Sequence, residues 1–239
     1  MAQRTLLQIV TAFTERRALG VPTTVFGSAD KQVRQIRSLL EEGCIALAGR
    51  GQWEGLTKEA SWATTAVEDQ GAVTTLAPDG YRYMLPETLW DRTEKIPLVG
   101  RLTPQDWQAL KAVVVTGPRY NFRLRGGRFL VNPAPPAAHT WVFEYISENW
   151  AETAAAVGIN YFTADTNVIR LPDFIVNSDL NWRWKKEKGL TYAQDFEDHE
   201  ALVIEALARD GGSKPTLYMH DSGNELRPGI VVPVGSWPL

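Results

Sequence analysis

The stretch that decides the fold reads Tyr120-Asn121-Phe122-Arg123-Leu124-Arg125-Gly126-Gly127-Arg128-Phe129-Leu130-Val131. Large apolar residues alternate with polar residues on both sides of the two glycines. This pattern predicts a β-hairpin with a two-residue turn, because glycine takes positive φ at both turn positions without strain. The prolines that follow, in residues 132–136, end the second strand, and residues 140–146 supply a third. We therefore expect a β meander here, with helical segments before and after it in the chain.

Composition limits the classes of protein to consider. At 239 residues the chain is long enough for one large domain or two small ones, and 44% hydrophobic residues can build a core. The net charge of −3 gives no general attraction to nucleic acid or membrane. The single cysteine excludes an intrachain disulfide and fits a reducing compartment. No apolar run approaches the roughly 20 residues that span a bilayer, and the N-terminus has no apolar segment typical of a signal peptide.

Two helices are predicted before the β region. In residues 5–19, Leu6, Ile9, Val10 and Phe13 share one face. Residues 29–48 form the second helix, with Ser28 as the expected N-cap and Cys44 in the apolar stripe. We interpret Cys44 as a buried thiol and not a nucleophile, because free cysteine usually behaves as a small hydrophobe.

The segments on either side of the hairpin are assigned from shorter patterns. Residues 58–65 and 72–76 are predicted strands, residues 85–90 a short helical turn, and residues 96–102 an extended segment. Thr103-Pro104 begins a helix that ends near residue 113, since threonine is a good N-cap and proline fits the first helical position. Residues 151–160 are alanine-rich and unpatterned, which indicates an exposed loop.

A helix over residues 172–188 carries apolar residues on two sides. One side contains Phe174, Ile175, Ser178 and Trp182, and the nearly opposite side contains Val176, Leu180 and Trp184. A helix with two apolar stripes needs partners on both sides. We assign one side to the chain's own bundle, and we predict that Val176, Leu180 and Trp184 form a subunit–subunit interface.

Three features could indicate a ligand, but each has a simpler explanation. Lys185, Lys186 and Lys188 beside tryptophans could line a groove for a nucleic-acid strand, but cations are also favoured at a helix C-terminus. In the last helix, residues 191–209, Asp195 and His199 are one turn apart, as metal ligands could be, but His199 also lies in the apolar stripe, and we favour a packed core histidine. Residues 165–167 begin like a calcium loop and lack its later ligands.

The motifs of common catalytic sites are absent from the sequence. There is no G-x-S-x-G elbow, no Walker loop, no H-E-x-x-H motif and no Cys/His cluster. We therefore expect no enzyme activity, no cofactor and no metal.

An ordered set of turn and packing signals extends over nearly the whole chain. It comprises Gly27-Ser28, Glu41-Glu42-Gly43, Trp53, Leu85-Pro86-Glu87, Trp90-Asp91-Arg92, Thr103-Pro104 with Trp107, Gly117-Pro118 with Tyr120, Arg125-Gly126-Gly127, Asn132-Pro133-Ala134-Pro135-Pro136, Phe143-Glu144-Tyr145 and Trp182-Arg183-Trp184-Lys185. In order and spacing this set resembles the head-to-tail adaptor proteins of short-tailed bacteriophages, which are also called tail tubular protein A or head-completion proteins.

The resemblance implies an α+β fold, in which a helical bundle of N- and C-terminal helices carries an inserted antiparallel β domain and an extended C-terminal tail. The bundle would comprise residues 1–56 and 160–212, the β domain residues 57–159, and the tail residues 213–239.

The resemblance also implies a structural role in the virion, with host cytoplasm as the location before assembly. The chain would form a homo-oligomeric ring, with twelve copies expected, beneath the portal protein ring. It would extend the channel for double-stranded DNA without specific binding and anchor the nozzle or hub proteins of the tail. No membrane partner is expected.

A DNA channel should not grip the phosphate backbone, because each phosphate contact strengthens binding and slows passage. We therefore expect Arg123, Arg125 and Arg128 to face a tail protein, a neighbouring subunit or solvent, and not the channel. The alternative function is a tail-associated carbohydrate-binding or hydrolytic module, in which Trp62, Trp90, Trp107 and Trp141 would stack on sugars.

The C-terminal segment from Lys214 is rich in proline and also apolar. Such a segment can add to the sheet edge of a partner or lie in its groove. We predict that it docks on the portal or on an adjacent copy. The expected anchors are Tyr218, Ile230, Val231, Val232, Trp237 and Leu239.

Overall fold

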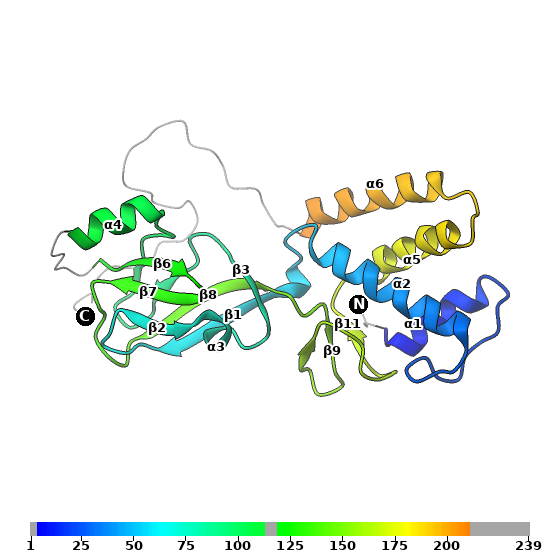
Figure 1. Cartoon of the computed structure of the whole chain (residues 1–239), viewed down its shortest axis with the longest axis horizontal. Coiled ribbons are helices and arrows are strands. Elements are labelled where there is room, and N and C mark those ends of the chain that lie inside the picture. The colour runs from blue at the N-terminus through cyan, green and yellow to red at the C-terminus, as the bar shows by residue number, and fades with distance from the viewer. Residues whose placement is uncertain (1–3, 113–118, 211–239) are drawn as a thin grey trace, which may run out of the picture.

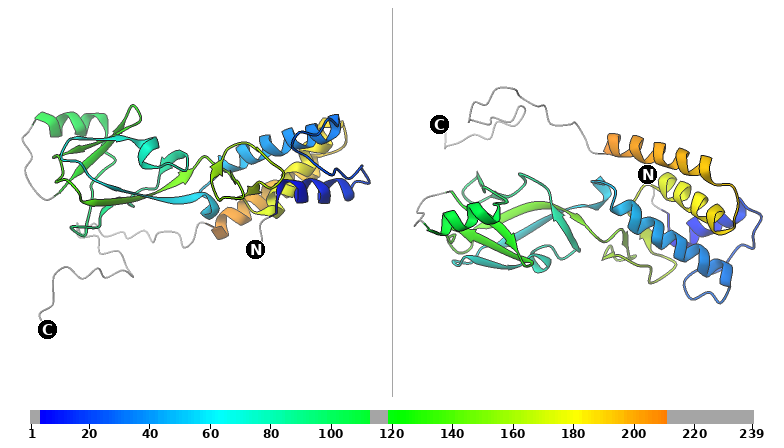
Figure 2. Two further views of the ribbon diagram at one scale, coloured as in Figure 1. Left: turned by 90° about the horizontal axis from the view of Figure 1, so that it is seen from below. Right: turned by 45° about the horizontal axis from the view of Figure 1, so that its top comes forward.

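The computed structural model describes residues 4–112 and 119–210 of the chain. These residues form a mixed α+β fold in which the named strands pair in antiparallel fashion. The molecule is elongated: α1, α2, α5 and α6 gather at one end, and the larger sheets lie at the other (Figures 1 and 2). The predicted α+β class is confirmed at this level.

Two helices near the N-terminus are close to their predicted positions. Helix α1, Leu6–Glu15, begins at a capping box, in which the Thr5 hydroxyl accepts from the Gln8 amide. Helix α2, Lys31–Ala48, is capped by Asp30, whose carboxylate accepts from the Gln32 amide at 2.7 Å. The prediction that Ser28 caps α2 is wrong, because the Ser28 hydroxyl accepts from the Asp30 amide instead.

The other two long helices follow the β region. Helix α5 is Asp173–Glu187 and helix α6 is Ala193–Asp210. They share one hydrophobic core, which we call the helical core, with α1, α2 and the short helix η1, Glu54–Leu56. Trp53 anchors the end of α2, because its buried indole N–H donates to the Leu47 carbonyl at 2.8 Å.

The predicted hairpin is confirmed. Strands β6, Asn121–Arg125, and β7, Arg128–Asn132, pair in register around Gly126 and Gly127, whose φ values are 57° and 72°. Strand β2, Asp69–Ala72, adds to β7 and completes a three-stranded sheet.

The predicted meander is wrong, because β8, Thr140–Ser147, leaves the hairpin. It pairs with β1, Thr57–Ala63, along its length, and with β3, Tyr81–Met84, and β4, Trp90–Asp91, on its other side. Strand β5, Ile96–Pro97, extends this sheet from β4. Six of the eight β8 residues are buried, which explains why β8 lies at the centre of a sheet.

Three further local predictions are wrong. Residues Val73–Leu76 form the short helix α3 and not a strand. Residues 85–90 form a turn that leads into β4 and not a helical turn. The expected exposed loop 151–160 contains β9, Ala151–Glu152, and β10, Gly158–Ile159, which pair with each other, and β9 also pairs with β11, Val168–Ile169. Helix α4, Pro104–Ala112, follows the predicted Thr103 cap.

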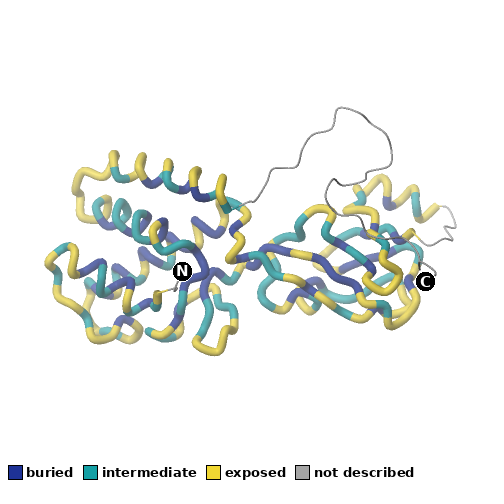
Figure 3. The backbone as a smooth tube through the Cα atoms, turned by 180° about the vertical axis from the view of Figure 1, so that it is seen from behind, coloured by how far each residue is buried: buried dark blue, intermediate teal, exposed yellow. Residues whose placement is uncertain are grey.

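Two hydrophobic cores lie along the molecule (Figure 3). The second, the β core, contains Phe122, Phe129, Trp141 and Phe143. Ile146, Trp150 and Ala151 instead belong to the helical core, so the small sheet β10–β9–β11 packs with the helices. In the described parts of the chain, no helix is long and apolar enough to cross a membrane.

Candidate functional site: a basic groove between α1 and α5

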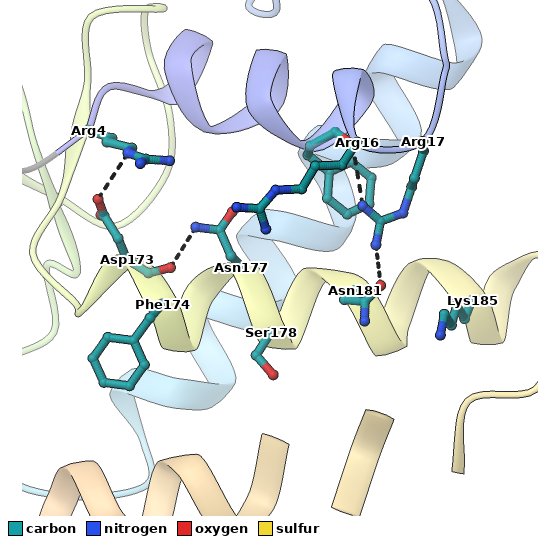
Figure 4. Close-up of a pocket in the computed structure, with 10 residues that line it drawn as sticks. Arg4, Arg16, Arg17, Asp173, Phe174, Asn177, Ser178, Asn181 and Lys185 are labelled. Atoms are coloured by element: carbon teal, nitrogen blue, oxygen red, sulfur yellow. Dashed lines mark hydrogen bonds and ion pairs between the residues drawn. The ribbon is translucent and has the colours of Figure 1, made fainter. Parts of the chain in front are cut away.

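A groove of about 620 Å³ lies between α1 and α5 (Figure 4). Its walls come from Arg4 just before α1, Phe13 near the end of α1, the turn that follows α1, and one side of α5. The ten lining residues are Arg4, Phe13, Arg16, Arg17, Asp173, Phe174, Asn177, Ser178, Asn181 and Lys185. Four of these residues are cations and only Asp173 is an acid, so the groove favours a negatively charged partner.

Two of the cations are held by contacts in the groove wall. The Arg17 guanidinium lies 3.8 Å from the centre of the Phe13 ring, donates to the Phe13 carbonyl at 3.3 Å and also donates to Asn181. Burial, followed by nearby Arg16, lowers the pKa of Arg17. Arg4 Nε lies 3.6 Å from Asp173 Oδ2. These contacts fix the walls and leave the middle of the groove open.

Arg16 differs from these two cations. It is exposed, and among the described residues its side chain has no ion-pair or hydrogen-bond partner. Its side chain extends over α5 toward Asn177 (Figure 4). Burial raises the pKa of Asp173, the only acid in the groove, in spite of the nearby Arg4. The groove therefore offers one uncompensated guanidinium to a partner.

A smaller cavity of about 230 Å³ lies between α5 and the C-terminal part of α6, and Phe174 lines both cavities. The Phe174 side chain is 51% exposed. An exposed phenylalanine between two cavities is a natural contact for an apolar side chain of a partner.

The structure corrects the predicted subunit interface on α5. Val176, Leu180 and Trp184 are buried in the helical core, at 1%, 0% and 5% exposure. They are covered by this chain itself, since α5 packs between α2 and α6, so they are not available to a second subunit. The exposed side of α5 is the groove side with Phe174.

A buried polar cluster joins α5 to α6. The Asp179 carboxylate accepts from Arg183 Nε at 2.7 Å and from the Trp182 indole at 3.1 Å, and it lies 3.3 Å from His199 Nε2. His199 is 1% exposed, which confirms the packed core histidine. The Nδ1 atom of His199 is buried without a partner among the described atoms. Nε2 is thus the ring nitrogen of His199 that faces a partner, the Asp179 carboxylate.

The predicted burial of Cys44 is also confirmed. Its side chain is fully buried, and burial, followed by the charge of Asp179, raises the pKa of the thiol well above its ordinary value. A thiol in this environment is a poor nucleophile.

The side chains that could have bound a metal, Asp195, His199 and Asp165, instead contact other groups of the protein. Asp195 pairs with Lys185 and accepts from Asn181, while His199 faces Asp179. The Asp165 carboxylate accepts from the amides of Val25 and Phe26, which braces the loop before α2. Within residues 4–112 and 119–210, no group of three or more His, Cys, Asp or Glu side chains could hold a metal ion.

The lysines after the tryptophans are engaged within the helical end. Lys185 pairs with Asp195, Lys186 lies over the Trp182 ring, and Lys188 donates to Gln35 and lies over the Trp184 ring. Lys185 and Lys186 occupy the last turn of α5, where cations are favoured.

The hairpin arginines have different surroundings. Arg128 pairs with Asp69, and Arg123 donates to the Pro104 carbonyl at 3.4 Å. Arg125 is exposed at the turn. The structure holds one chain, so the predicted contact of these residues with a neighbour or tail protein stays a prediction.

The tryptophans of the alternative carbohydrate hypothesis contribute to packing. Trp107 and Trp141 are buried, and Trp90 is half-buried. Trp62 packs edge-on against Phe129 and Phe143. Trp107 and Trp141 therefore offer no open ring face for sugar stacking.

Sequence reasoning missed one pair in the β region. His139 Nδ1 lies 2.8 Å from Oδ2 of the fully buried Asp91, whose Oδ1 accepts from the amides of Thr93 and Glu94. Burial acts to raise the pKa of Asp91, but the hydrogen bonds from His139 and from these amides act in the opposite direction. The hydrogen bonds outweigh burial, so the pKa of Asp91 lies below its ordinary value. No local signal links positions 91 and 139, because β4 and β8 meet only through the sheet.

The expected docking anchors Tyr218, Ile230, Val231, Val232, Trp237 and Leu239 lie outside the described residues. No family model matches this chain, and no similar curated protein was found.

Proposed function

We propose that this chain is a non-enzymatic head-to-tail adaptor of a short-tailed bacteriophage. Copies of the chain form a ring beneath the portal, extend the DNA channel and anchor the nozzle or hub proteins of the tail. The virion neck is its location, and the portal ring, the tail proteins and other copies of the chain are its partners.

The observation that carries this proposal is the arrangement of the chain in two parts. Helices from both ends of the sequence share the helical core, and the larger sheets project from it (Figure 1). This arrangement agrees with the helical bundle and inserted β domain that the resemblance implies. We propose the division into residues 1–56 with 160–212, 57–159, and the tail 213–239. Because Trp150 and Ala151 pack in the helical core, the β domain as a packing unit ends near residue 147.

Charge also agrees with passage of DNA. The chain has a net charge of −3, and two of the three hairpin arginines already contact groups of the chain itself. A channel wall that made many phosphate contacts would retard DNA. We propose that Arg123, Arg125 and Arg128 face a tail protein, a neighbouring subunit or solvent.

The first test mixes the purified chain with the portal ring of the same virus and measures mass and shape by native mass spectrometry and electron microscopy. The expected product is a portal ring that carries a closed ring of this chain. Monomers that never join the portal would overturn the proposal.

A second test truncates the chain after Gly212. The shortened protein should stay folded and soluble but fail to join the portal, since the removed segment carries the proposed anchors. If the truncated chain assembles normally, or if it unfolds as a monomer, the removed segment is not a docking segment. Binding to a glycan array or hydrolysis of cell walls by the full chain would instead favour the alternative carbohydrate function.

A further inference from the structure

The helical end of the molecule has two opposite edges, with α1 at one edge and α6 at the other (Figures 1 and 3). Helix α5 lies between them and packs on both α2 and α6. A subunit with two different edges can contact a second copy on each side. The chemistry of the two edges decides whether such contacts are favourable.

The α1 edge is basic. The cations flank α1 and do not lie in it: Arg4 precedes the helix, and Arg16 and Arg17 follow its last residue, Glu15. The groove between α1 and α5 is part of this edge, and it presents the unpaired Arg16 beside Arg4 and Lys185. The apolar contact that the groove offers is the half-exposed Phe174.

The α6 edge is acidic. Helix α6 contains six acids and one arginine. Glu197 and Asp198 are exposed, and no cation of the described chain pairs with either carboxylate. On a helical wheel, Glu197, Ala201, Ile204 and Ala208 lie on the side opposite the buried His199 and Val203. Ile204 is 67% exposed, and small alanines beside it allow another helix to approach closely.

We propose that the outer face of α6 docks in the α1–α5 groove of the next copy of this chain. Glu197 and Asp198 then face Arg16, and Ile204 meets Phe174. The 18-residue α6 is about 27 Å long, and the 15-residue α5 that forms one wall of the groove is about 22 Å long, so the two lengths are comparable. The proposal rests on the proposed ring function and adds the two surfaces that make the ring.

Charge excludes the other pairings of these edges. Two α6 edges related by a two-fold axis would bring unpaired carboxylates together, and two α1 edges would bring arginines together. Like charges placed against each other weaken an interface and disfavour that pairing. Only the head-to-tail pairing puts opposite charges in contact, and a head-to-tail contact can close into a ring.

The experiment uses charge reversal on each edge of the full chain. Arg16→Glu changes the groove, and Glu197→Arg with Asp198→Arg changes α6. All three side chains are exposed and lack an ion-pair partner among the described residues, so the variants should keep the fold, which circular dichroism checks. Self-association is measured by sedimentation velocity and native mass spectrometry over a concentration series.

Each variant alone should associate at least about tenfold more weakly than the wild type, because like charges then meet at every contact. An equimolar mixture of the two variants should recover assembly in alternating 1:1 order, because every contact is again between opposite charges. Lys95→Glu, the same charge change at an exposed site in the β region, is the matched control and should associate as the wild type does.

Three results would overturn the inference. They are unchanged association of either variant, failure of the mixture to recover, and a wild type that stays monomeric in solution. A wild type that is monomeric alone but still joins the portal ring would overturn these two surfaces and leave the adaptor function standing. If a charge-reversal variant does not fold, Arg16→Gln and Glu197→Gln with Asp198→Gln replace it, and weaker association of each is the expected result.

Discussion

Arg170 Nη1 donates a hydrogen bond to Asp79 Oδ2 at 2.6 Å, and this contact joins the turn before β3 to the chain that leaves β11. The same guanidinium donates to Glu152 at 3.0 Å and to the Asn149 carbonyl at 3.2 Å. The Arg170 side chain is only 3% exposed. Burial lowers its pKa, but the hydrogen bonds with Asp79 and Glu152 raise it to a net value above the ordinary one. One arginine thus connects the β region to the small sheet that packs on the helices.

Arg170→Met should destabilise the protein strongly, because Asp79 and Glu152 would lose their shared cation. Removal of one partner from a buried ion pair costs roughly 3–5 kcal/mol. The two carboxylates are about a quarter exposed, so we expect about 3 kcal/mol of unfolding free energy. Urea unfolding measures this loss.

Arg92→Met is the matched control for Arg170→Met. Arg92 pairs with Glu59 at 2.6 Å, but the two side chains are 55% and 48% exposed. Removing such a surface pair should cost about 1 kcal/mol or less. Equal losses in the two variants would show that Arg170 does not connect the two parts as described.

Gly43→Ala tests the closest approach of α2 to α5. A Cβ atom at position 43 would lie 2.0 Å from Asp179 Oδ2, so the buried carboxylate would have to move away from its partners. Overpacking of this kind costs roughly 1–3 kcal/mol, although alanine alone favours a helix by about 1 kcal/mol over glycine. We expect a lower melting temperature. Gly20→Ala, where the added Cβ would meet nothing within 4 Å, should be neutral or slightly stabilising.

The His199–Asp179 contact predicts a dependence of stability on pH. Burial lowers the pKa of His199 below its ordinary 6.5, although Asp179 acts in the opposite direction. The unfolded chain therefore takes up a proton near pH 6.5 more readily than the folded chain does. Stability should fall as the pH drops through this value. Glu200, Arg50 and Arg183 are the other charged groups that act on His199.

His199→Gln removes this group while keeping an amide near Asp179. The melting temperature of the wild type should fall between pH about 7.5 and about 5.5, and the variant should lose that part of the slope. Asp179 has a raised pKa because of burial, so it contributes stability at low pH that is lost as the pH rises. This acts against His199, and because His199 itself lowers the pKa of Asp179, the variant reports on the two groups as a coupled pair. Identical slopes would assign the dependence to another group.

Local sequence patterns correctly predicted the elements whose formation depends on neighbouring residues in the chain. The Gly126-Gly127 hairpin and the helices around Ile9, Ile36 and Val203 were found from turn residues and periodicity, since these signals act within one element. The predicted strand at residues 72–76 was wrong, because a pattern of five residues is too short to distinguish a strand from a helical turn.

Long-range pairing could not be predicted from the sequence. The partners of β8 lie up to 89 residues away in the chain, as in the pairing of Thr57 with Ile146, and no residue of β8 specifies which strand it joins. The groove was missed for the same reason: Arg16 and Lys185 are brought together only by the packing of α1 against α5. The acids of α6 were visible in the sequence, but their place opposite a basic edge was not.

Cys44 offers a direct measure of how tightly the helical core is closed. The thiol lies on α2 next to Gly43, is fully buried and has a raised pKa. A thiol reagent such as DTNB needs the exposed thiolate, so the native protein should react only when the core opens. With a stability in the usual range of about 5–15 kcal/mol, we expect labelling of the folded chain to be slower than that of the urea-unfolded chain by about a thousandfold or more. Gly43→Ala should speed labelling about tenfold for each 1.4 kcal/mol of stability that it loses, and Gly20→Ala should not speed it. Fast labelling of the folded wild type would contradict the closed core, and with it the assignment of Cys44 as a packing residue.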